Sequence, residues 1–457
     1  MPKKKTALTI EERLQQALVP AEEQPYEVPE NWVWVRLGSL ADVKGGKRLP
    51  KGTTFSENIT KHPYIRVTDF NDIGVSLEGL KYIDEDVYEK ISRYTISSDD
   101  IYVSIAGSIG KVGIIPSCID GANLTENAAK ITNIKGINQK NLCLFLKSEF
   151  AQYQMQSATI ATTQAKLALF RIESLTLPLP PLSEQQRIVE RIEELFAKLD
   201  EAKERLQEVA DSFAVRKAAI LHKAFTGELT KQWRWENGVS DESWEEKKLW
   251  EVGVLERGRS KHRPRNDERL FGGIYPFIQT GDVANADMFI EKHSQTLSDF
   301  GMQQSKLFAK NTICITIAAN IGKVAILSYD SCFPDSVVGL TTDEKNSYKY
   351  VYYYLSTQQK ELESKAPATA QKNINLKVLN DLDIPLPTLP EQHEIVRLID
   401  DLLARERAAQ QAAEQALASI DLMKKSILAR AFRGELGTNK ASEASALELL
   451  RQVLAEN

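Results

Sequence analysis

The sequence lacks long apolar runs and has little cysteine. No stretch of eighteen or more apolar residues occurs among its 457 residues, so no membrane-spanning helix is expected. The basic start, Met1 to Lys5, is followed by a polar segment that we expect to be helical (Ile10 to Leu18), so a secretory signal is not expected either. The four cysteines are widely spaced without a CxxC pair, which favours buried thiols in a reducing cytoplasm.

Recognisable catalytic motifs are also absent. The five histidines are scattered, with no HExxH or other paired spacing, so a zinc site is not expected. The run Gly107 to Val112 is too short for a phosphate-binding loop and has valine where that loop needs a hydroxyl. No Asn-Pro-Pro-aromatic or Asp-Pro-Pro-Tyr tetrapeptide of an amino-methyltransferase occurs. The sequence therefore predicts a non-catalytic chain that binds no metal or cofactor of its own.

One arrangement leaves a nuclease open as an alternative. Pro334-Asp335 followed by Glu363-Ser364-Lys365 matches the acidic residue and ExK pattern of many metal-dependent nucleases. In such enzymes Glu and Lys lie on a strand beside the metal, whereas here they end a Tyr- and Gln-rich segment that reads as helix. The pattern also occurs in only one part of the chain.

Net charge argues mildly against nucleic-acid binding, but the charges are unevenly distributed. The formal net charge is −5 and the pI is about 5.8, whereas DNA-binding domains are usually basic. Two short segments are nevertheless crowded with cations: Lys44, Lys47, Arg48 and Lys51 in one, and Arg257, Arg259, Lys261, Arg263, Arg265 and Arg269 in the other. Each could be a solvated loop, but their equivalent places in an internal repeat favour a shared function.

That repeat is the most informative feature of the sequence. Leu177 to Gln185 (LPLPPLSEQ) returns as Ile384 to Gln392 (IPLPTLPEQ), and Ile220 to Leu229 returns as Ile427 to Leu436, both 207 residues on. Upstream the offset is 212, where Ile101 to Val112 matches Ile313 to Val324 and Gly46 matches Gly258. One long unit is therefore duplicated in register, and approximate two-fold symmetry is expected.

Each repeat has a strand-rich part followed by a long helix. The parts before the PLP segments are rich in short β-branched runs, glycine and Asp/Asn turns, which is typical of a compact α/β domain. Ile101 to Ile105 alternates apolar and hydroxyl residues, the pattern of a half-buried strand. Ser183 with Gln186 predicts a capping box at the start of the first helix. From Ser183 to Phe225 that helix would span on the order of 60 Å.

Both helices carry an apolar seam at three- and four-residue steps, which favours a coiled coil. The seam of the first helix is Ile188, Ile192, Leu195, Leu199, Ala202, Leu206, Val209, Phe213 and Ile220. The seam of the second, from about Glu391, is Ile395, Ile399, Leu402, Ala409, Ala413, Ala416, Ile420 and Ile427. Large residues facing small ones predict that the helices pack on each other, although two independent bundle helices remain an alternative.

This layout resembles the specificity subunit of type I restriction–modification systems. The motifs Leu177 to Val189 and Ile384 to Val396 carry the resemblance, with the helix-end motifs Ala224 to Leu229 and Ala431 to Leu436. The resemblance extends over nearly the whole chain from about residue 29. It implies an α+β chain with two strand-rich α/β target-recognition domains in pseudo-two-fold arrangement, separated by two long helices that form an antiparallel coiled coil.

The resemblance sets the expected domain boundaries. They are an N-terminal extension at 1–28, read as a tether or partner-binding arm, recognition domain 1 at 29–182, a central helical spacer and linker at 183–240, recognition domain 2 at 241–389, and a C-terminal helical spacer and tail at 390–457.

The resemblance also implies function and partners. Each recognition domain would read one half of a bipartite target in double-stranded DNA, and the helices would set the gap between the halves. Two adenine-methylating (M) subunits, which use S-adenosylmethionine, would dock on the helical regions. Restriction (R) subunits would add ATP- and magnesium-dependent translocation and cleavage. A DNA-independent interaction scaffold, suggested by the acidic balance and long helices, is the other alternative.

DNA-contacting residues are expected in equivalent loops of the two domains. Base edges need bidentate groups: Arg or Lys for guanine, Asn or Gln for adenine, Asp or Glu for cytosine. Candidates in the first domain are Lys47, Arg48, Arg66, Thr68 and Asp69, and in the second Arg259, Lys261, Gln279, Thr280 and Asp282. Phosphate or loop-positioning roles are predicted for Lys111, Lys323, Thr163, Gln164 and Gln371. The tyrosine run 352–354 is predicted to lie on an interior helix face rather than to stack on bases.

Overall fold

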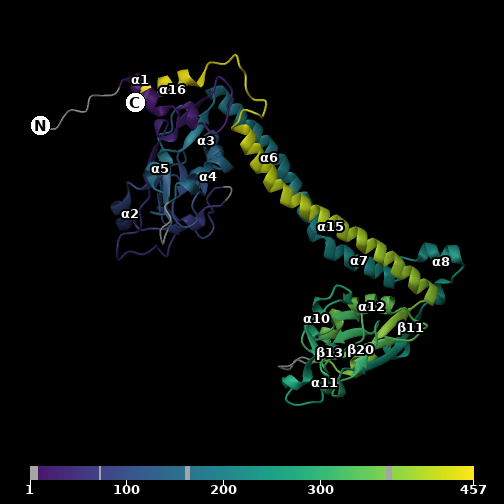
Figure 1. Ribbon diagram of the computed structural model, residues 1–457. Helices are drawn as coiled ribbons and strands as arrows, with labels where there is room; N and C mark the ends of the chain where they lie inside the picture. The colour runs from purple at the N-terminus through teal and green to yellow at the C-terminus, as the bar shows by residue number, and fades with distance from the viewer. Residues whose placement is uncertain (1–8, 72–73, 160–164, 367–372, 457) are drawn as a thin grey trace. The chain divides into compact units, whose positions relative to one another are not determined.

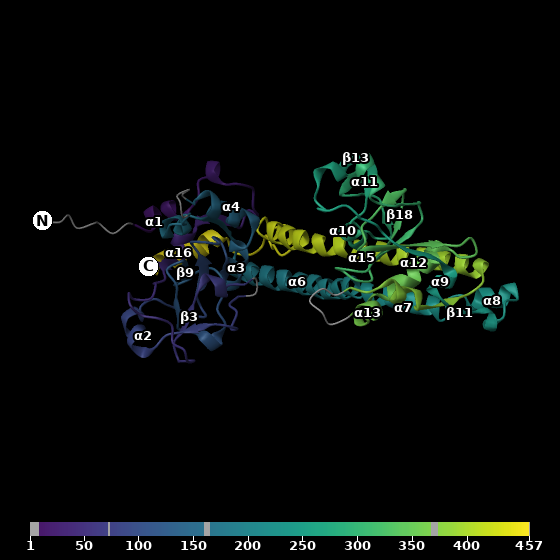
Figure 2. The same cartoon turned by 90° about the horizontal axis from the view of Figure 1, so that it is seen from below.

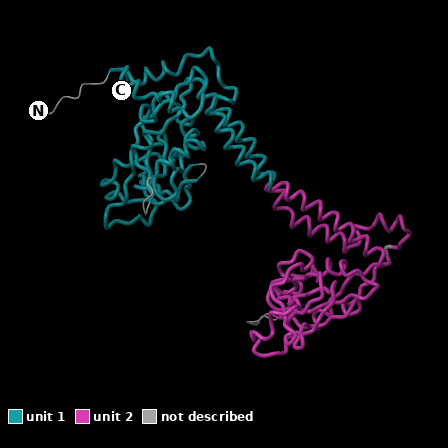
Figure 3. The backbone as a smooth tube through the Cα atoms, viewed as in Figure 1, with its two compact units in different colours: residues 1–206, 415–457 teal, residues 207–414 magenta. Residues whose placement is uncertain are grey.

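The computed structural model (Figure 1, turned by 90° in Figure 2) describes residues 9–71, 74–159, 165–366 and 373–456. The chain forms two compact units (Figure 3). Unit 1 contains residues 1–206 and 415–457, and unit 2 contains residues 207–414. Each unit holds one strand-rich domain together with parts of the long helices, as the repeat predicts.

The strand-rich domain of unit 1 has two four-stranded sheets and a two-stranded ribbon. The first sheet has the order β2-β9-β6-β7, with β2 (Asp42–Gly45), β9 (Ala128–Thr132), β6 (Ile101–Ser104) and β7 (Val112–Gly113). The second has the order β4-β3-β8-β5, with β4 (Lys81–Tyr82), β3 (Pro63–Ile65), β8 (Ala122–Leu124) and β5 (Thr95–Ile96). The ribbon pairs β1 (Val33–Arg36) with β10 (Thr176–Leu179).

Unit 2 repeats this plan strand for strand and adds an edge strand. The order β12-β20-β17-β18-β14 joins β12 (Gly253–Arg257), β20 (Val337–Thr342), β17 (Ile313–Thr316), β18 (Val324–Leu327) and the additional β14 (Phe289–Ile290). The order β15-β13-β19-β16 joins β15 (Gln295–Leu297), β13 (Phe271–Phe277), β19 (Ser331–Cys332) and β16 (Leu307–Phe308). The ribbon pairs β11 (Glu245–Lys248) with β21 (Asp383–Leu386).

The predicted strand at Ile101 is confirmed, but it is buried on both faces rather than on one. Ile101 and Val103 contribute to the larger core of unit 1, while Tyr102, on the opposite face, contributes to a second core. The Tyr102 ring is stacked on Phe70 with a centroid separation of 3.8 Å. The second sheet therefore covers the face that an isolated strand pattern would leave in solvent.

Short helices complete each domain. Unit 1 contains α1 (Ile10–Ala17), α2 (Glu85–Ile91), α3 (Gln139–Leu146), α4 (Glu149–Ser157), α5 (Leu169–Glu173) and α16 (Ala446–Ala455). Unit 2 contains α8 (Lys231–Asn237), α9 (Leu249–Val252), α10 (Thr280–Asn285), α11 (Asp299–Gln303), α12 (Tyr348–Thr357), α13 (Gln359–Ser364) and α14 (Leu376–Asn380).

The N-terminal segment is part of unit 1 instead of a free arm. Helix α1 lies beside α16, and the Arg13 guanidinium donates a hydrogen bond of 3.2 Å to the carbonyl of Leu454. Ala17 and Val19 are buried. The expected tether is therefore wrong for residues 9–19, because apolar side chains there are needed to complete the core.

The long helices are antiparallel within each unit. They are α6 (Leu182–Asp211), α7 (Phe213–Phe225) and α15 (Leu389–Ala431). In unit 1 Asp200 pairs with Lys424 at 2.5 Å and Lys203 with Asp421 at 3.7 Å, so numbering rises on one helix as it falls on the other. In unit 2 Arg216 of α7 pairs with Glu406 of α15.

Several details of the predicted helices are wrong. The first helix begins at Leu182, so Ser183 lies within its first turn instead of capping it, and Ser212 separates α6 from α7. Val209 and Ala409 are exposed, whereas Ile420 and Ala413 on the predicted seam are buried. Each long helix has a single partner helix, which covers only part of the predicted apolar seam.

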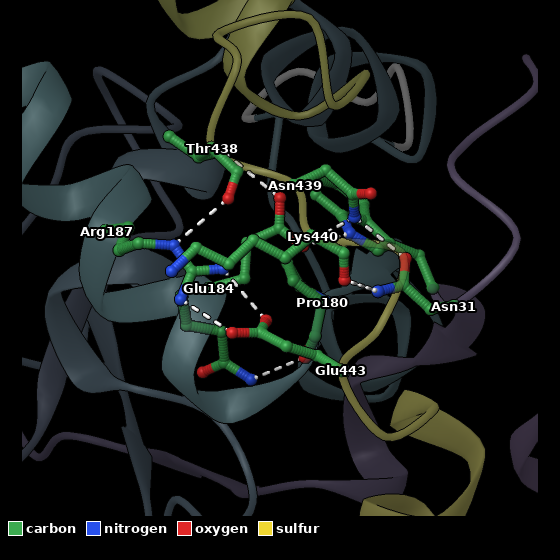
Figure 4. A network of polar contacts seen from close by, with 10 residues as sticks. Asn31, Pro180, Glu184, Arg187, Thr438, Asn439, Lys440 and Glu443 are labelled. Atoms are coloured by element: carbon green, nitrogen blue, oxygen red, sulfur yellow. Dashed lines mark hydrogen bonds and ion pairs between the residues drawn. The ribbon is translucent and has the colours of Figure 1, made fainter.

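The repeated Glu-Gln motif locks the start of each long helix. In unit 1 the fully buried Glu184 carboxylate accepts hydrogen bonds from the Asn439 amide at 2.8 Å and the Thr438 hydroxyl at 3.1 Å (Figure 4). It also accepts one from the Trp32 indole at 2.7 Å. Arg187, one turn further on, makes a bidentate ion pair with Glu443, with both distances 2.8 Å. The segment that follows the end of α15 is thereby fixed to the start of α6.

In unit 2 Glu391 has the equivalent position. One of its carboxylate oxygens accepts hydrogen bonds from Arg234 and Thr230, each at 2.7 Å, and from the Trp244 indole at 3.1 Å. The adjoining glutamines are also equivalent: Gln185 and Gln392 each donate at 2.9 Å to the carbonyl of the proline five residues earlier. The motif that stands out in the sequence is therefore structural, because its polar side chains hold the domain, the helix start and the segment after the other helix together.

Among the described residues, the longest helices are too polar to cross a bilayer, and no span of the required length and hydropathy is found.

Candidate nucleic-acid interface

Arg66 and Asp69 form a tight pair where β3 ends in the first domain. The Asp69 carboxylate accepts the Arg66 backbone N–H at 2.7 Å and two guanidinium bonds, at 3.1 Å from Nε and 2.6 Å from Nη2. Asp69 is 5% exposed, whereas the Arg66 side chain is 32% exposed and Thr68 between them is exposed. The structure therefore gives Asp69 a positioning role, and Arg66 and Thr68 remain the side chains available to a ligand.

Loss of the Asp69 carboxylate is expected to lower the free energy of unfolding by about 2 kcal/mol, because a hydrogen-bonded charge pair is removed. Thermal unfolding of Asp69→Ala, Arg66→Ala and the double variant measures the coupling between the two side chains. Additive effects of the two single substitutions would contradict the pairing.

The backbone of the Lys47 loop is held by contacts with β8 and β3. A Cβ at Gly46 would lie 2.1 Å from the Thr125 carbonyl oxygen, so only glycine allows the chain to pass there. Beyond it, the Lys47 N–H donates to the Leu124 carbonyl at 2.8 Å, and the Tyr64 hydroxyl donates to the Lys47 carbonyl at 2.7 Å. Burial raises the pKa of Tyr64 to about 12, so this hydroxyl stays a donor at neutral pH. The backbone is fixed while the side chains of Lys47 and Arg48 are exposed.

The second domain repeats this construction. A Cβ at Gly258 would lie 2.2 Å from the Pro334 carbonyl oxygen, and the Arg259 N–H donates to the Phe333 carbonyl at 3.1 Å. Arg259 and Lys261 are exposed, and neither side chain has a polar partner within the described parts of the chain. Two loops of the same geometry therefore present exposed cations, which suits the binding of a polyanion. In the first loop Arg48 also pairs with Glu126 at 3.5 Å, and Lys47 lies over the Tyr94 ring.

Other cations of the second basic segment have structural partners. Arg265 makes a bidentate contact with Asp335, at 2.8 and 3.1 Å. Arg269 is paired with Asp267 at 2.7 Å, and its hydrogen bonds hold the pKa of that carboxyl well below its usual range. Fewer cations of the second basic segment are therefore available to a ligand than the sequence suggests.

Gln279 lies where β13 ends, at the position equivalent to Arg66. Its amide donates to the Gln295 side-chain oxygen at 3.0 Å, and its backbone N–H donates to Asp282 at 2.7 Å. Asp282 also accepts the Ser294 hydroxyl at 3.1 Å, so it positions the turn as Asp69 does. Thr280, the first residue of α10, is half-buried. A hollow of about 450 Å³ gathers the polar residues of this region, among them Arg259, Arg265, Gln279, Gln295 and Gln304.

Lys111 and Lys323 occupy equivalent tight loops. The Lys111 N–H donates to the Ser104 hydroxyl at 2.8 Å and the Lys323 N–H to the Thr316 hydroxyl at 3.0 Å. The Lys111 ammonium also donates to the Phe70 carbonyl at 3.0 Å, close to Asp69 in the chain. The structure thus brings Lys111 next to the Arg66 turn, which the sequence could not show.

Thr163, Gln164 and Gln371 lie outside the described residues, so their predicted roles stay predictions. Four residues near the predicted sites were missed: Lys81, Lys166, Gln295 and Gln304. Lys166 lines a hollow of about 630 Å³ beside Lys47, Arg48 and Glu126. Strand pairing and loop packing bring these four into place, and no motif in the sequence indicates them.

The nuclease pattern is not assembled in the way the chemistry needs. Glu363 lies on α13, as predicted, and accepts a hydrogen bond of 2.8 Å from Gln359, while Lys365 just beyond pairs with Glu361 at 2.6 Å. Asp335 is engaged by Arg265. Within the described ranges, no three His, Cys, Asp or Glu side chains are grouped to hold a metal ion.

Two tyrosines of the run 352–354 are buried in α12, as predicted, and Tyr354 is half-buried. Tyr352 and Tyr353 are 6% and 4% exposed. Burial and a hydrogen bond to Asp400 raise the pKa of Tyr353 far above its ordinary value. Tyr350 and Tyr354 contact the Phe225 ring edge-on, at 5.4 and 5.2 Å, which fixes α12 to the end of α7. These rings support the helices and are not available for stacking on bases.

Comparison with protein families gives one match that accounts for both repeats. A family described as the type I restriction modification DNA specificity domain matches residues 29–211 and 241–416. The two matched stretches include both strand-rich domains and the first part of the long helix that follows each of them.

Individual proteins agree with the family match. The chain is 26% identical to the EcoBI type I restriction enzyme specificity subunit of Escherichia coli, over 94% of this chain and 93% of that protein. It is 25% identical to the EcoKI specificity subunit of Escherichia coli strain K12, over 94% and 96%. A crystal structure of the HsdS subunit from Thermoanaerobacter tengcongensis has the same fold, with a TM-score of 0.65 at 21% identity over 90% of this chain and 99% of that one.

Proposed function

This chain belongs to the type I restriction–modification DNA specificity family, and from that membership we propose that each of its strand-rich domains reads one half of a bipartite DNA target. The observation that carries the proposal is the duplicated, glycine-dependent loop at Gly46 and Gly258, which presents exposed cations from a fixed backbone in both domains. Phosphate contacts need such cations, and base contacts need side chains held in position. The chain is a non-catalytic subunit, and catalysis belongs to its partners.

The partner subunits supply the methylation and restriction activities of the proposed complex. Two methyltransferase subunits, which use S-adenosylmethionine, dock on the helical regions and modify adenine in each half-site. Restriction subunits, with ATP and magnesium, complete the translocating nuclease. The two-fold repeat supports two copies of one partner, because equivalent surfaces recur at the starts of α6 and α15.

The long helices set the gap between the half-sites. Half-sites about one helical turn apart are separated by roughly 34–36 Å, a distance that a compact loop could not bridge but a long helix can. The antiparallel ion pairs within each unit support a stiff spacer.

The proposal predicts different roles for lysine and arginine at the interface. In the complex with the methyltransferase, Lys111→Ala and Lys323→Ala are each expected to weaken binding to all DNA sequences alike. Each should also reduce the slope of log K against log salt concentration by the amount that corresponds to about one phosphate contact. Arg66→Ala is expected to relax preference at one base pair, by roughly 10-fold. Binding titrations with cognate and mismatched duplexes at several salt concentrations measure both effects. The opposite pattern would reverse the assigned roles, and salt-independent binding would contradict the proposal.

A further inference from the structure

Strand pairing places Lys81 and Gln295 at the same position in the two domains. In unit 1, β3 pairs antiparallel with β4, and Tyr64 lies opposite Lys81. In unit 2, β13 pairs antiparallel with β15, and Phe277 lies opposite Gln295. Tyr64 and Phe277 correspond in the repeated Pro-aromatic-Ile motif. Lys81 and Gln295 are therefore equivalent, although no sequence motif connects them.

Each of these residues lies near the side chain that ends the neighbouring strand. In unit 2 the Gln279 amide is bonded directly to the Gln295 oxygen at 3.0 Å. In unit 1 the Arg66 guanidinium donates to the carbonyl of Gly79 at 3.2 Å, two residues before Lys81. Lys81 and Gln295 are both exposed, and the Lys81 ammonium has no partner in the described parts of the chain.

The two domains thus have different side chains at equivalent sites. Unit 1 has two cations, Arg66 and Lys81, which offer only donors. Unit 2 has two amides, Gln279 and Gln295, each with a donor and an acceptor. One bond joins the amides and orients them. Within the described parts of the chain the Gln295 nitrogen has no hydrogen-bond partner, and each amide oxygen has two lone pairs with which to accept.

The surroundings of the amide pair suit a base edge. Gln279 and Gln295 line the hollow of about 450 Å³ that also contains Arg259, whose exposed side chain has no polar partner among the described residues. This arrangement matches DNA, because the two amides can donate to and accept from a base edge while the Arg259 cation faces a phosphate nearby. The turn beneath is fixed by Asp282, as the equivalent turn in unit 1 is fixed by Asp69.

We infer that this site determines which base pair each domain selects, with Arg66 and Lys81 reading a G·C pair in one half-site and Gln279 and Gln295 reading an A·T pair in the other. In the major groove guanine presents two acceptors, which match donors alone. Adenine presents an acceptor and a donor, which match a glutamine amide. This assignment rests on the proposed function and adds the chemical identity of one base pair in each half-site.

Exchange of the two side chains tests the inference. Lys81→Gln and Gln295→Lys are made separately in the full chain, produced with its methyltransferase partner, and the methylated DNA motif is read by sequencing that detects N6-methyladenine. Lys81→Gln is expected to reduce discrimination for G·C at one position of one half-site by roughly 10-fold and leave the other half unchanged. Gln295→Lys is expected to change one A·T position in the other half only.

Matched controls carry the same substitutions elsewhere on the same units. Lys90→Gln changes α2, where Lys90 pairs with Asp86 at 3.6 Å, and Gln232→Lys changes α8, where the exposed Gln232 donates to Glu236 at 2.8 Å. Both controls should leave the motif unaltered. Continued stringency at the unchanged half-site shows that each variant is folded and assembled.

The outcomes separate the inference from the function. A wild-type bipartite motif with both halves unchanged in Lys81→Gln and Gln295→Lys would overturn the inference and leave the function intact. Changes by both variants in the same half-site, or a motif with no G·C pair in the half that Lys81→Gln affects, would also overturn it. Absence of any chain-dependent motif for the wild type would instead overturn the proposed function.

Discussion

Replacing Glu391 with alanine is expected to lower the free energy of unfolding of unit 2 by about 3–5 kcal/mol. Glu391 is fully buried and is the carboxylate partner of Arg234, which is 6% exposed. Removing the carboxylate leaves a buried guanidinium and the Thr230 hydroxyl without this acceptor, and both were desolvated on folding. For a unit of this size such a loss lowers the melting temperature by roughly 10 °C.

A double variant separates the buried charge from the packing around it. Arg234→Met combined with Glu391→Leu removes both charges and keeps apolar volume, and we expect it to recover at least half of the loss, since a buried pair replaced by apolar side chains is often tolerated. Glu414→Ala, an exposed position on the same helix, is the matched control and should change stability by less than about 0.5 kcal/mol. Calorimetry of the full chain compares the four proteins. A single variant no less stable than this control would show that Glu391 does not hold the helix start.

Shortening the paired helices by one heptad is expected to bring the recognised half-sites about three base pairs closer together. Seven residues of helix span about 10.5 Å, and three base pairs rise about the same distance. Residues 198–204 of α6 and 420–426 of α15 face each other in unit 1, since they contain both members of the pairs Asp200–Lys424 and Lys203–Asp421. Removing both segments together keeps the apolar seam in phase and removes both members of these two interhelical ion pairs.

An insertion of one heptad in each helix at the same places is the matched control, and should widen the gap by about three base pairs. The methylated motif of each variant, read in cells that also contain the methyltransferase, gives the gap directly. A folded, active variant with an unchanged gap would show that the helices do not set the distance.

The repeat made much of the architecture predictable from the sequence. In-register duplication gave two equivalent domains, and the three- and four-residue seam gave the long helices, because both patterns are local and periodic. The limits of the seam were less predictable. Val209 and Ala409 fit the heptad but are exposed, since the partner helix covers only part of the predicted stripe.

The candidate site was predicted in part. In unit 1 the Lys47 loop is hydrogen-bonded to Tyr64, two residues before Arg66, and in unit 2 Arg259 and Gln279 line one hollow. Gly46 and Gly258 impose the same backbone path on the two loops. Asp69 and Asp282 were expected to read bases, but the structure uses their carboxylates to hold turns, and a turn-capping Asp cannot be told from a base-reading one by residue type alone. Lys81 and Gln295 were missed because antiparallel register, rather than sequence spacing, makes them equivalent.

The most direct test of the central claim is the methylation pattern of DNA in cells that carry the methyltransferase partner, with and without this chain. The account predicts a bipartite motif with N6-methyladenine on both strands that disappears when the chain is removed. A methylated motif that persists without the chain, or no chain-dependent motif from an assembled complex, would contradict it.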